Sequence, residues 1–312
     1  MKKEIWVFGS HDGHEYGDNS KALFEYASSQ KDVKAVWLAK STKVVNEVKS
    51  NGFKAFSFFS LSGIYHAFFS KKNIVSHSLS DLPTYAFLRS RCKKNIQLWH
   101  GTPLKRLDVG NKRSLFNKVI RYIFLVILGS EYNLVTVSTS QTKEVLAKFF
   151  NVNQSVVKIT GYPRNDSLLI QNNKSNVHKL LNIKQNSKLI FYMPTFREYS
   201  QDDKTFNLFI KYGFNFTKME SFLREQNAHL IIKLHPRDYK HTKKVLKGIR
   251  DRSNLISIIK PGYEHVDLYK LLNASKDFVL FFLFLFLFCA KCSRLIKELS
   301  AYIKISLRLC FF

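Results

Sequence analysis

The hydrophobic positions of this chain come in short runs that polar loops separate. Near the N-terminus the runs cover residues 4–8, 33–38 and 55–59, and residues 42–50 between the last two have helical spacing. Further runs cover residues 74–76, 96–99, 134–138, 156–160, 189–193 and 230–234. Runs of this length are typical of buried strands, and strands that alternate with helices indicate a parallel sheet with helices on both faces. The pattern therefore predicts an α/β fold.

The loop after the first run contains glycines at positions 9, 13 and 17. Their spacing matches neither the dinucleotide fingerprint nor a phosphate-binding P-loop, so we expect no cofactor motif there. Asn19 or Ser20 can cap a following helix, whose inner face would carry Leu23, Tyr26 and Ala27. A loop that admits an acceptor and a simple turn before a capped helix both fit this segment.

Four of the predicted strands end in the same way, with a histidine or an arginine beside a proline. The endings are His-Gly-Thr-Pro-Leu-Lys at residues 100–105, Gly-Tyr-Pro-Arg-Asn-Asp at 161–166, Pro-Thr-Phe-Arg at 194–197 and His-Pro at 235–236. The carboxyl ends of strands are where open α/β sheets bind ligands, and these side chains suit phosphate groups. The repeated layout predicts a shared site for a phosphate-bearing ligand.

In this order and at these intervals, the four motifs resemble the CDP-glycerol glycerophosphotransferase family of teichoic-acid and capsule polymerases. The segments at residues 6–9 and 18–20 are similar to that family as well, and the resemblance runs from residue 4 to about residue 277. It implies a GT-B-like fold, in which two Rossmann-like domains face a cleft. We expect an acceptor-side domain over residues 1–150, with a boundary near Asn151, and a nucleotide-donor domain over residues 151–277.

The resemblance also implies a reaction, the transfer of glycerol phosphate from CDP-glycerol to a hydroxyl of a lipid-linked polyol-phosphate acceptor, with release of CMP. Such a transfer needs a base and positive charge around the phosphoryl oxygens. His100 is the candidate base and His235 the second catalytic candidate. The expected substrate-binding residues are Thr102, Lys105, Arg164, Thr195, Arg197 and Lys233. The histidines and arginines also have structural interpretations, which are an ion pair with Asp166 for Arg164 and an ion pair at a helix N-terminus or between domains for Arg197.

The charge of the chain favours anionic partners. Lys and Arg number 50 against 23 Asp and Glu, which gives a net charge of +27 and a pI near 9.9. Polyphosphate, acidic lipid and nucleic acid would all fit this excess. We expect no nucleic-acid partner because the aromatic residues fall in apolar segments and no nucleic-acid motif is visible. A basic nucleic-acid-binding protein remains the more distant alternative.

A second alternative is a GT-B glycosyltransferase that uses a nucleotide sugar. Such an enzyme commonly holds the sugar hydroxyls with a carboxylate, for which Glu198 and Glu264 are the candidates. The motifs do not distinguish glycerol phosphate from ribitol phosphate.

One segment suggests contact with a membrane surface. Residues 115–128 are largely apolar and follow a cluster of lysines and arginines at residues 105–113. The apolar part is too short to span a bilayer, so an amphipathic helix on anionic lipid and a buried helix are both consistent with it. No signal peptide is evident, and we expect peripheral attachment to the cytoplasmic face of the membrane.

After Asp277 the sequence changes character. Residues 278–288 contain only Phe, Val and Leu. Similar family members continue instead with an Asp-Tyr-Ser-Ser loop, where backbone N–H groups would receive the donor pyrophosphate. Residues 278–312 therefore form an aberrant tail, explained by a frameshift or truncation that impairs donor binding. The alternative is a short hydrophobic anchor followed by a basic amphipathic helix over residues 291–308.

Neither cysteines nor metal-ligand spacing point to a metal or a cofactor. The chain has four cysteines, and the pair Cys289 and Cys292 lacks a second pair that zinc would require. No group of Asp, Glu or His has ligand spacing, so we predict that the reaction needs no metal. His77 follows a short strand and either faces the cleft or is an ordinary loop histidine.

Overall fold

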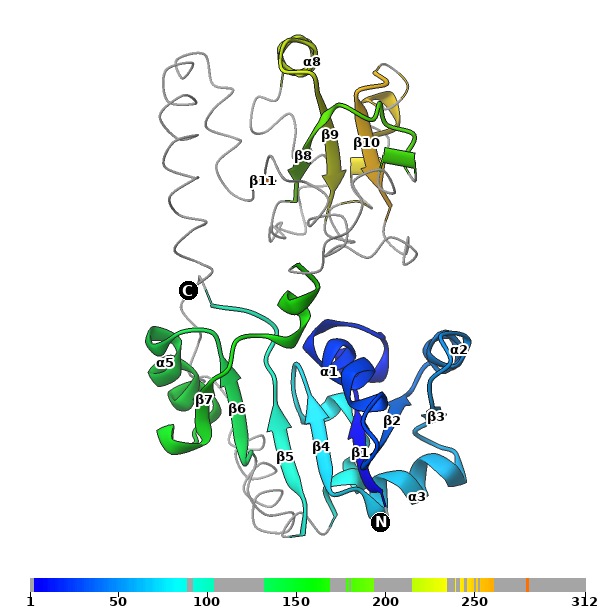
Figure 1. Ribbon diagram of the computed structural model, residues 1–312, viewed down its shortest axis with the longest axis vertical. Helices are drawn as coiled ribbons and strands as arrows, with labels where there is room; N and C mark the ends of the chain where they lie inside the picture. Colours follow the sequence, from blue (N-terminus) through cyan, green and yellow to red (C-terminus); the bar gives the residue numbers. More distant parts are fainter. Residues whose placement is uncertain are drawn as a thin grey trace, which may run out of the picture. The chain divides into compact units, whose positions relative to one another are not determined.

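The computed structural model describes residues 3–88, 92–103, 132–168, 178–179, 181–193, 215–234, 239, 242–243, 246–249, 251, 253–260 and 279–280. The chain divides into two compact units, Met1–Asp166 and Ser167–Phe312, and each contains a parallel sheet (Figure 1). This arrangement confirms the predicted α/β fold.

The first unit contains a seven-stranded sheet in the order β3-β2-β1-β4-β5-β6-β7, and all neighbouring strands are parallel. The strands are β1 (Glu4–Phe8), β2 (Val33–Ala39), β3 (Ala55–Ser57), β4 (Lys72–Val75), β5 (Lys94–Gln97), β6 (Leu134–Val137) and β7 (Val157–Ile159). The order reverses direction between β1 and β4. In open α/β sheets, the crevice at the carboxyl ends of such a pair of strands is the preferred ligand site.

Helices cover both faces of this sheet because its strands are apolar on both sides. Val36 and Trp37 are neighbours on β2, yet they belong to different core clusters and neither is accessible to solvent. The helices are α1 (Asp18–Ser28), α2 (Thr42–Ser50), α3 (Leu61–Phe69) and α5 (Ser140–Phe150). Residues of α1 and α2 pack with Trp37, whereas residues of α3 and α5 pack with Val36. Short 3-10 helices cover His11–Gly13, Leu79–Asp81, Thr84–Phe87, Gln154–Val156 and Pro163–Leu168.

The start of α1 differs from the sequence expectation. The helix begins at Asp18, after Gly17, so Asn19 and Ser20 lie inside its first turn and are buried instead of capping it. Its core face carries Phe24 and Ala27, whereas Tyr26 is 65% exposed. The side chains of Asn19 and Ser20 bond to the loops after β5 and β4, and these long-range contacts fix how the helix is turned.

The boundary between the units also lies later in the chain than the one expected near Asn151. The reason is β7, which pairs in parallel with β6 and therefore belongs to the first sheet. Strand β5 is shorter than expected, since it ends at Gln97, and β3 ends at Ser57.

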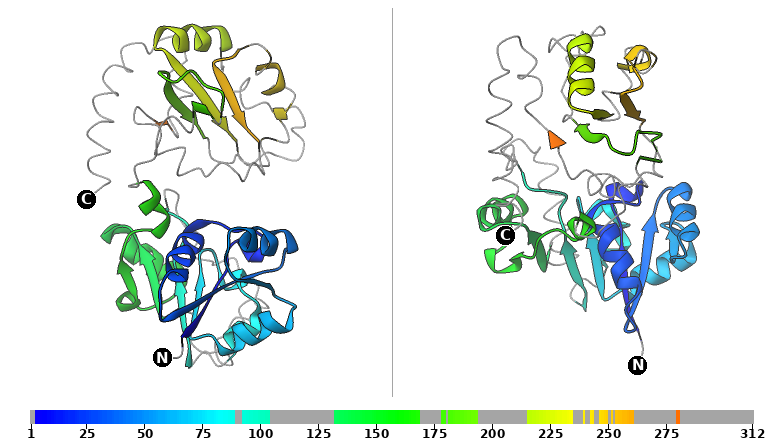
Figure 2. Two further views of the ribbon diagram at one scale, coloured as in Figure 1. Left: turned by 45° about the vertical axis from the view of Figure 1, so that its right-hand side comes forward. Right: turned by 45° about the horizontal axis from the view of Figure 1, so that its top comes forward.

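The second unit contains a four-stranded parallel sheet in the order β10-β9-β8-β11. Its strands are β8 (Lys188–Tyr192), β9 (Ala228–Lys233), β10 (Ile256–Ile259) and β11 (Val279–Leu280). Helix α8 (Phe216–Glu225) lies over this sheet (Figure 2) and buries Met219 and Leu223. Asn215 caps α8 by accepting a hydrogen bond from the backbone N–H of Lys218 at 3.0 Å.

The first residues of the predicted tail take part in this sheet, because β11 pairs with β8. Residues 281–312 and the apolar segment at 115–128 lie outside the described residues. Within the part of the chain that is described, no helix combines the length and the hydrophobicity that crossing a bilayer requires.

Candidate functional site

Polar side chains gather at the carboxyl ends of the strands near the position between β1 and β4 where the strand order reverses. This position is the switch point of the sheet. His11 follows β1, His77 follows β4, His100 follows β5 and Arg164 follows β7. Because these strands belong to one parallel sheet, their carboxyl ends lie along the same edge. Asp18, at the start of α1, lies among these residues.

His100 lies between two other rings. Its imidazole stacks on that of His77 with centroids 4.6 Å apart and planes inclined by 7°, and the Trp99 ring lies at 3.9 Å. Its Nδ1 lies 3.4 Å from the carbonyl oxygen of Ser76, which can only accept a hydrogen bond. Nδ1 therefore donates, and the lone pair of the neutral ring is on Nε2. Partial burial lowers the pKa of His100, and the charge of Arg164 lowers it further.

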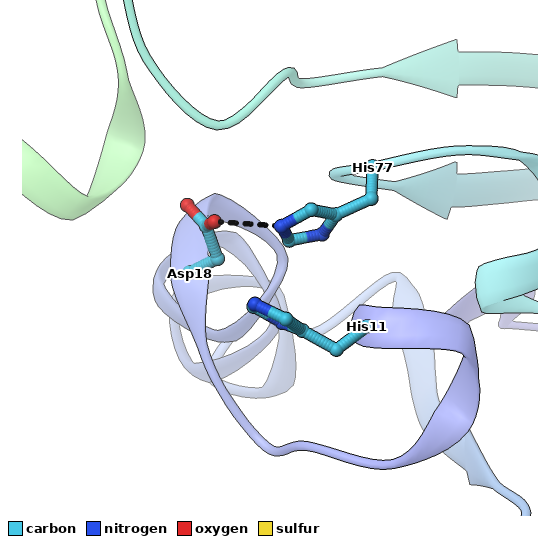
Figure 3. Close-up of side chains that lie close together, drawn as sticks. All are labelled: His11, Asp18 and His77. Carbon is cyan, nitrogen blue, oxygen red and sulfur yellow. Dashed lines mark ion pairs between the residues drawn. The ribbon is translucent and has the colours of Figure 1, made fainter. Parts of the chain in front are cut away.

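His77 connects His100 to a carboxylate. Its Nε2 lies 3.5 Å from Oδ2 of Asp18 (Figure 3), and its ring is tilted by 49° against that of His11 at 3.8 Å. Burial lowers the pKa of His77 to about 4, and repulsion from His11 contributes, although Asp18 acts in the opposite direction. At neutral pH His77 is therefore uncharged, so its ring can stack on His100 without electrostatic repulsion.

Asp18 and Arg164 form the central ion pair of the site. Arg164 Nη1 donates to Asp18 Oδ1 at 2.5 Å, and Arg164 Nη2 donates to the carbonyl oxygen of His100 at 2.7 Å. The Asp18 side chain is only 7% exposed. Arg164 thus pairs with Asp18 rather than with Asp166, which was the structural interpretation offered by the sequence. A charge pair that is this well buried holds its geometry firmly, because a lone partner would be costly.

Asn19 joins three segments that are distant in the sequence. Its Nδ2 donates to the carbonyl oxygen of Trp99 at 2.6 Å, and its Oδ1 accepts from the backbone N–H of Arg164 at 3.2 Å. Next to it, the hydroxyl of Ser20 lies 2.7 Å from that of Ser76. These buried contacts position the loops that carry His100 and Arg164 relative to α1.

Asp81 anchors the loop that carries His77. Its carboxylate accepts hydrogen bonds from the backbone N–H groups of Ser76, His77 and Asp12, all at 2.8–2.9 Å. The side chain has no exposed surface. Burial raises the pKa of Asp81, although the three N–H donors counteract that effect.

Backbone strain also concentrates here. Among the described residues, seven other than glycine have a positive φ, and four of them lie at this site: His11, Asp12, Asp18 and Trp99. Asparagine, aspartate and histidine adopt this conformation more readily than other residues, so the strain is greatest at Trp99. Such conformations persist only where surrounding contacts hold them, and they are frequent at functional sites. Trp99 in particular turns the chain after β5, so that His100 faces His77.

The structure describes four of the eight site residues that the sequence predicts. It brings His100 and Arg164 into contact, and the exposed Thr102 beside them has its hydroxyl 2.8 Å from that of Ser138. Lys233 ends β9 in the second unit. The others lie outside the described residues: Lys105, Thr195, Arg197 and His235. Their roles stay predictions, as does the idea that all four motifs share one site.

Sequence reasoning missed Asp18 and His11 as site residues and left His77 undecided. The ligand atoms of these three residues lie within 4.8 Å of one another, an arrangement that divalent cations can use. Their positions in the sequence, 11, 18 and 77, have no metal-ligand spacing, so only the fold brings them together. Because Arg164 already holds one oxygen of Asp18, we describe the group as an ion-pair cluster. That the reaction needs no metal stays a prediction.

A comparison with known protein families supports the resemblance that the sequence motifs carry. The family model described as CDP-Glycerol:Poly(glycerophosphate) glycerophosphotransferase matches residues 1–277. The chain belongs to this family. The match ends where the sequence changes character, and it includes all the predicted site residues.

Curated relatives of this glycerophosphotransferase family carry related names. A teichoic acid glycerol-phosphate transferase of Staphylococcus aureus (strain NCTC 8325 / PS 47) is 27% identical over 203 residues, which are 63% of this chain and 51% of that protein. A teichoic acid poly(glycerol phosphate) polymerase of Bacillus spizizenii is 26% identical over 247 residues, 75% of this chain and 59% of that protein. The chain therefore spans little more than half the length of these two relatives.

Solved structures show the fold of this family member independently. The wall teichoic acid polymerase TagF superposes with a TM-score of 0.66 at 21% identity, over 90% of this chain and 66% of that chain. A UDP-GlcNAc 2-epimerase from Neisseria meningitidis superposes with a TM-score of 0.52 at 11% identity, over 89% of this chain and 77% of that chain. At these identities the likeness concerns the fold alone.

Proposed function

We propose that this chain transfers glycerol phosphate from CDP-glycerol to a hydroxyl of a polyol-phosphate acceptor and releases CMP, in teichoic acid or capsule synthesis. The observation that carries the proposal is the contact between two family motifs, in which Arg164 donates to the carbonyl oxygen of His100 at the switch point of the sheet. A variant of TagF, the structural relative, was soaked with CDPG, which supports a donor of this kind.

In this proposal His100 is the general base. Its Nε2 accepts the proton of the acceptor hydroxyl, the alkoxide oxygen attacks the phosphorus that carries glycerol, and the bond from that phosphorus to the CMP oxygen breaks. A neutral imidazole is needed, and the lowered pKa of His100 keeps it neutral at physiological pH. Arg164 is a positioning residue, since Asp18 and the carbonyl oxygen of His100 already occupy its two Nη atoms. In this proposal Thr102, whose exposed hydroxyl lies 2.8 Å from that of Ser138, donates a hydrogen bond to a phosphate oxygen.

The acceptor of this reaction is lipid-linked, and the protein attaches peripherally to the cytoplasmic face of the membrane. The large positive charge supports both statements, since anionic headgroups and a polyphosphate product attract it. The donor side is impaired if residues 278–312 replace a pyrophosphate-binding loop.

The test measures CMP release from CDP-glycerol with a soluble polyol-phosphate acceptor. The substitution His100→Ala should reduce release by about 100-fold or more, because a general base contributes that much, with an unchanged circular dichroism spectrum. His14→Ala is the matched control, since His14 is an exposed histidine near the same site. Turnover retained by the His100 variant would end the base assignment.

A parallel measurement of thermal stability separates the proposal from its enzymatic alternative. A ligand that binds the native state raises the melting temperature. CDP-glycerol should do so and UDP-sugars should not. The reverse result would favour a nucleotide-sugar glycosyltransferase.

A further inference from the structure

Helix α3 has its apolar side chains on the outside. Among the described residues, the most exposed large hydrophobic side chains are Leu61 at 87% and, just before the helix, Phe59 at 80%. Along the helix they are joined by Ile64, Tyr65, Phe68 and Phe69, which are 36–51% exposed. We call these six residues the α3 apolar face.

The inner side of α3 explains this orientation. Gly63, His66 and Ala67 are the buried residues of the helix. A Cβ atom at Gly63 would come within 2.1 Å of the carbonyl oxygen of Ser57, so the helix can approach β3 only with glycine there. The ring of His66 stacks on that of Phe56 at 4.9 Å with planes inclined by 14°. Small residues and a stacked histidine thus hold the helix in place, and its large hydrophobic side chains are left outside.

The segment that contains the α3 apolar face carries lysines and no acidic residue. No Asp or Glu occurs between Glu47 and Asp81 in the sequence. Lys54 and Lys71 are exposed, and Lys71 is the second residue after the end of the helix. The pKa of His66, on the buried side of α3, is lowered chiefly by burial, and the charges of Lys34 and Lys54 lower it further, so positive charge reaches this part of the fold.

We propose that the α3 apolar face, together with the exposed Lys54 and Lys71, which we call the lysine rim, binds the surface of an anionic lipid bilayer. An apolar helix face of this kind enters the boundary between headgroups and acyl chains, and lysines beside it attract anionic headgroups. If two copies of the chain met through this face, the lysines of one copy would face those of the other and repel them. Charge therefore favours lipid over self-association. The inference rests on the membrane attachment proposed above and names the surface that makes it.

The first experiment measures how the full chain partitions onto phosphatidylglycerol and phosphatidylcholine vesicles. The double variant Phe59→Gln/Leu61→Gln should weaken binding to phosphatidylglycerol vesicles about tenfold or more, because two large apolar side chains no longer leave water. The matched control is Val145→Gln/Ile159→Gln, which removes two exposed apolar residues from α5 and β7 and should change binding less than twofold. Equal effects of both double variants, or wild-type protein that does not bind, would overturn the proposal.

A second pair of variants tests the lysine rim. Lys54→Glu/Lys71→Glu should weaken binding to phosphatidylglycerol vesicles about tenfold and leave binding to phosphatidylcholine unchanged. Lys158→Glu/Lys188→Glu changes the net charge equally at exposed lysines on β7 and β8. If this control weakens binding as much, net charge rather than this surface directs attachment.

A site-specific probe tests whether the α3 apolar face itself enters the bilayer. In a background with all four cysteines changed to serine, an environment-sensitive dye on Leu61→Cys should shift its emission to shorter wavelength when phosphatidylglycerol vesicles are added. The same dye on Ile159→Cys, also exposed, should not shift. A shift at neither position, or at both equally, would contradict the assignment.

Two further readouts separate this proposal from its rivals. Phe59→Gln/Leu61→Gln should release CMP at the wild-type rate from a soluble acceptor without lipid, so that failure of the proposed reaction is distinguishable from failure of this surface. Sedimentation without lipid should give the same mass for the wild type and the variant. Loss of a dimer in the variant, with unchanged vesicle binding, would identify a second copy as the occupant.

Discussion

The carboxyl edge of the first sheet and the α3 apolar face depart from the usual distribution of residues in opposite ways. At the sheet edge a charged pair, Asp18 and Arg164, is largely buried, and Trp99 has a strained backbone. On α3, Leu61 and its neighbours are exposed although they are large and apolar. Burial of charge and exposure of hydrophobic surface both lower stability relative to an ordinary fold.

The difference between the two regions lies in how firmly each is held. The sheet edge is linked by hydrogen bonds from three loops, with Asn19 at the centre. On α3 the rings of Tyr65 and Phe69 contact each other at 4.8 Å, and both side chains stay about half exposed. Rigid placement suits a site for phosphoryl transfer, whereas an exposed apolar face suits a partner that has no fixed shape.

Loss of the ion pair between Asp18 and Arg164 should have the strongest effect on the sheet edge. Asp18→Asn leaves Arg164 largely buried without its carboxylate, so unfolding should become easier by about 3 kcal/mol. Because Arg164 and His77 both lose a partner, kcat/KM should fall about 100-fold. Chemical denaturation and CMP release measure the two effects.

Asp166→Asn is the matched control, since Asp166 is exposed and close to Arg164 in the sequence. Its effect on the free energy of unfolding should stay within about 0.5 kcal/mol. If the two variants behave alike, the rigid ion pair is not what distinguishes the sheet edge from α3.

A smaller effect is expected from Gly101→Ala. Gly101 has a φ of 150°, and a Cβ there would lie 3.4 Å from Nη2 of Arg164. The variant should lose about 1 kcal/mol of stability through backbone strain, and displacement of Arg164 and His100 should lower kcat/KM about tenfold. Melting curves and steady-state kinetics provide the measurements.

Gly52→Ala provides the comparison for that variant. Gly52 also has a positive φ, of 82°, but no atom lies near the position of an added Cβ. It should show the same loss of stability with unchanged kcat/KM. A loss of activity in both variants would mean that turnover depends on global stability instead of local geometry.

The smallest effect concerns pH. The pKa of His100 is lowered by burial, and a general base must be unprotonated to act. As the pH falls, kcat/KM should therefore decline with a midpoint below about 6.5, the ordinary value for histidine. A profile of kcat/KM against pH over the acid range measures it.

A midpoint at or above the ordinary value would contradict the crowded environment described for His100. The double variant Phe59→Gln/Leu61→Gln should leave the midpoint where it is, since these residues belong to α3 and not to the site. A shifted midpoint in that variant would show that α3 and the sheet edge are energetically coupled.

Much of the fold could be predicted from the amino-acid pattern alone. Apolar runs identified most of the described strands, because a buried parallel strand must be apolar along its length. The motifs at residues 100–105 and 161–166 located two loops of the site, since ligands bind at strand ends, and the resemblance they carry gave the family.

Which side chains meet at the site depends on the three-dimensional fold. Asp18 and Arg164 are 146 residues apart, and their pairing depends on strand order, which no local pattern encodes. The same holds for His77, which reaches His100 because β4 lies beside β5. In α3 nearly every position is small or apolar, so the pattern leaves its inner face undetermined. The close approach of Gly63 to Ser57 decides it, because only that side of the helix fits against β3.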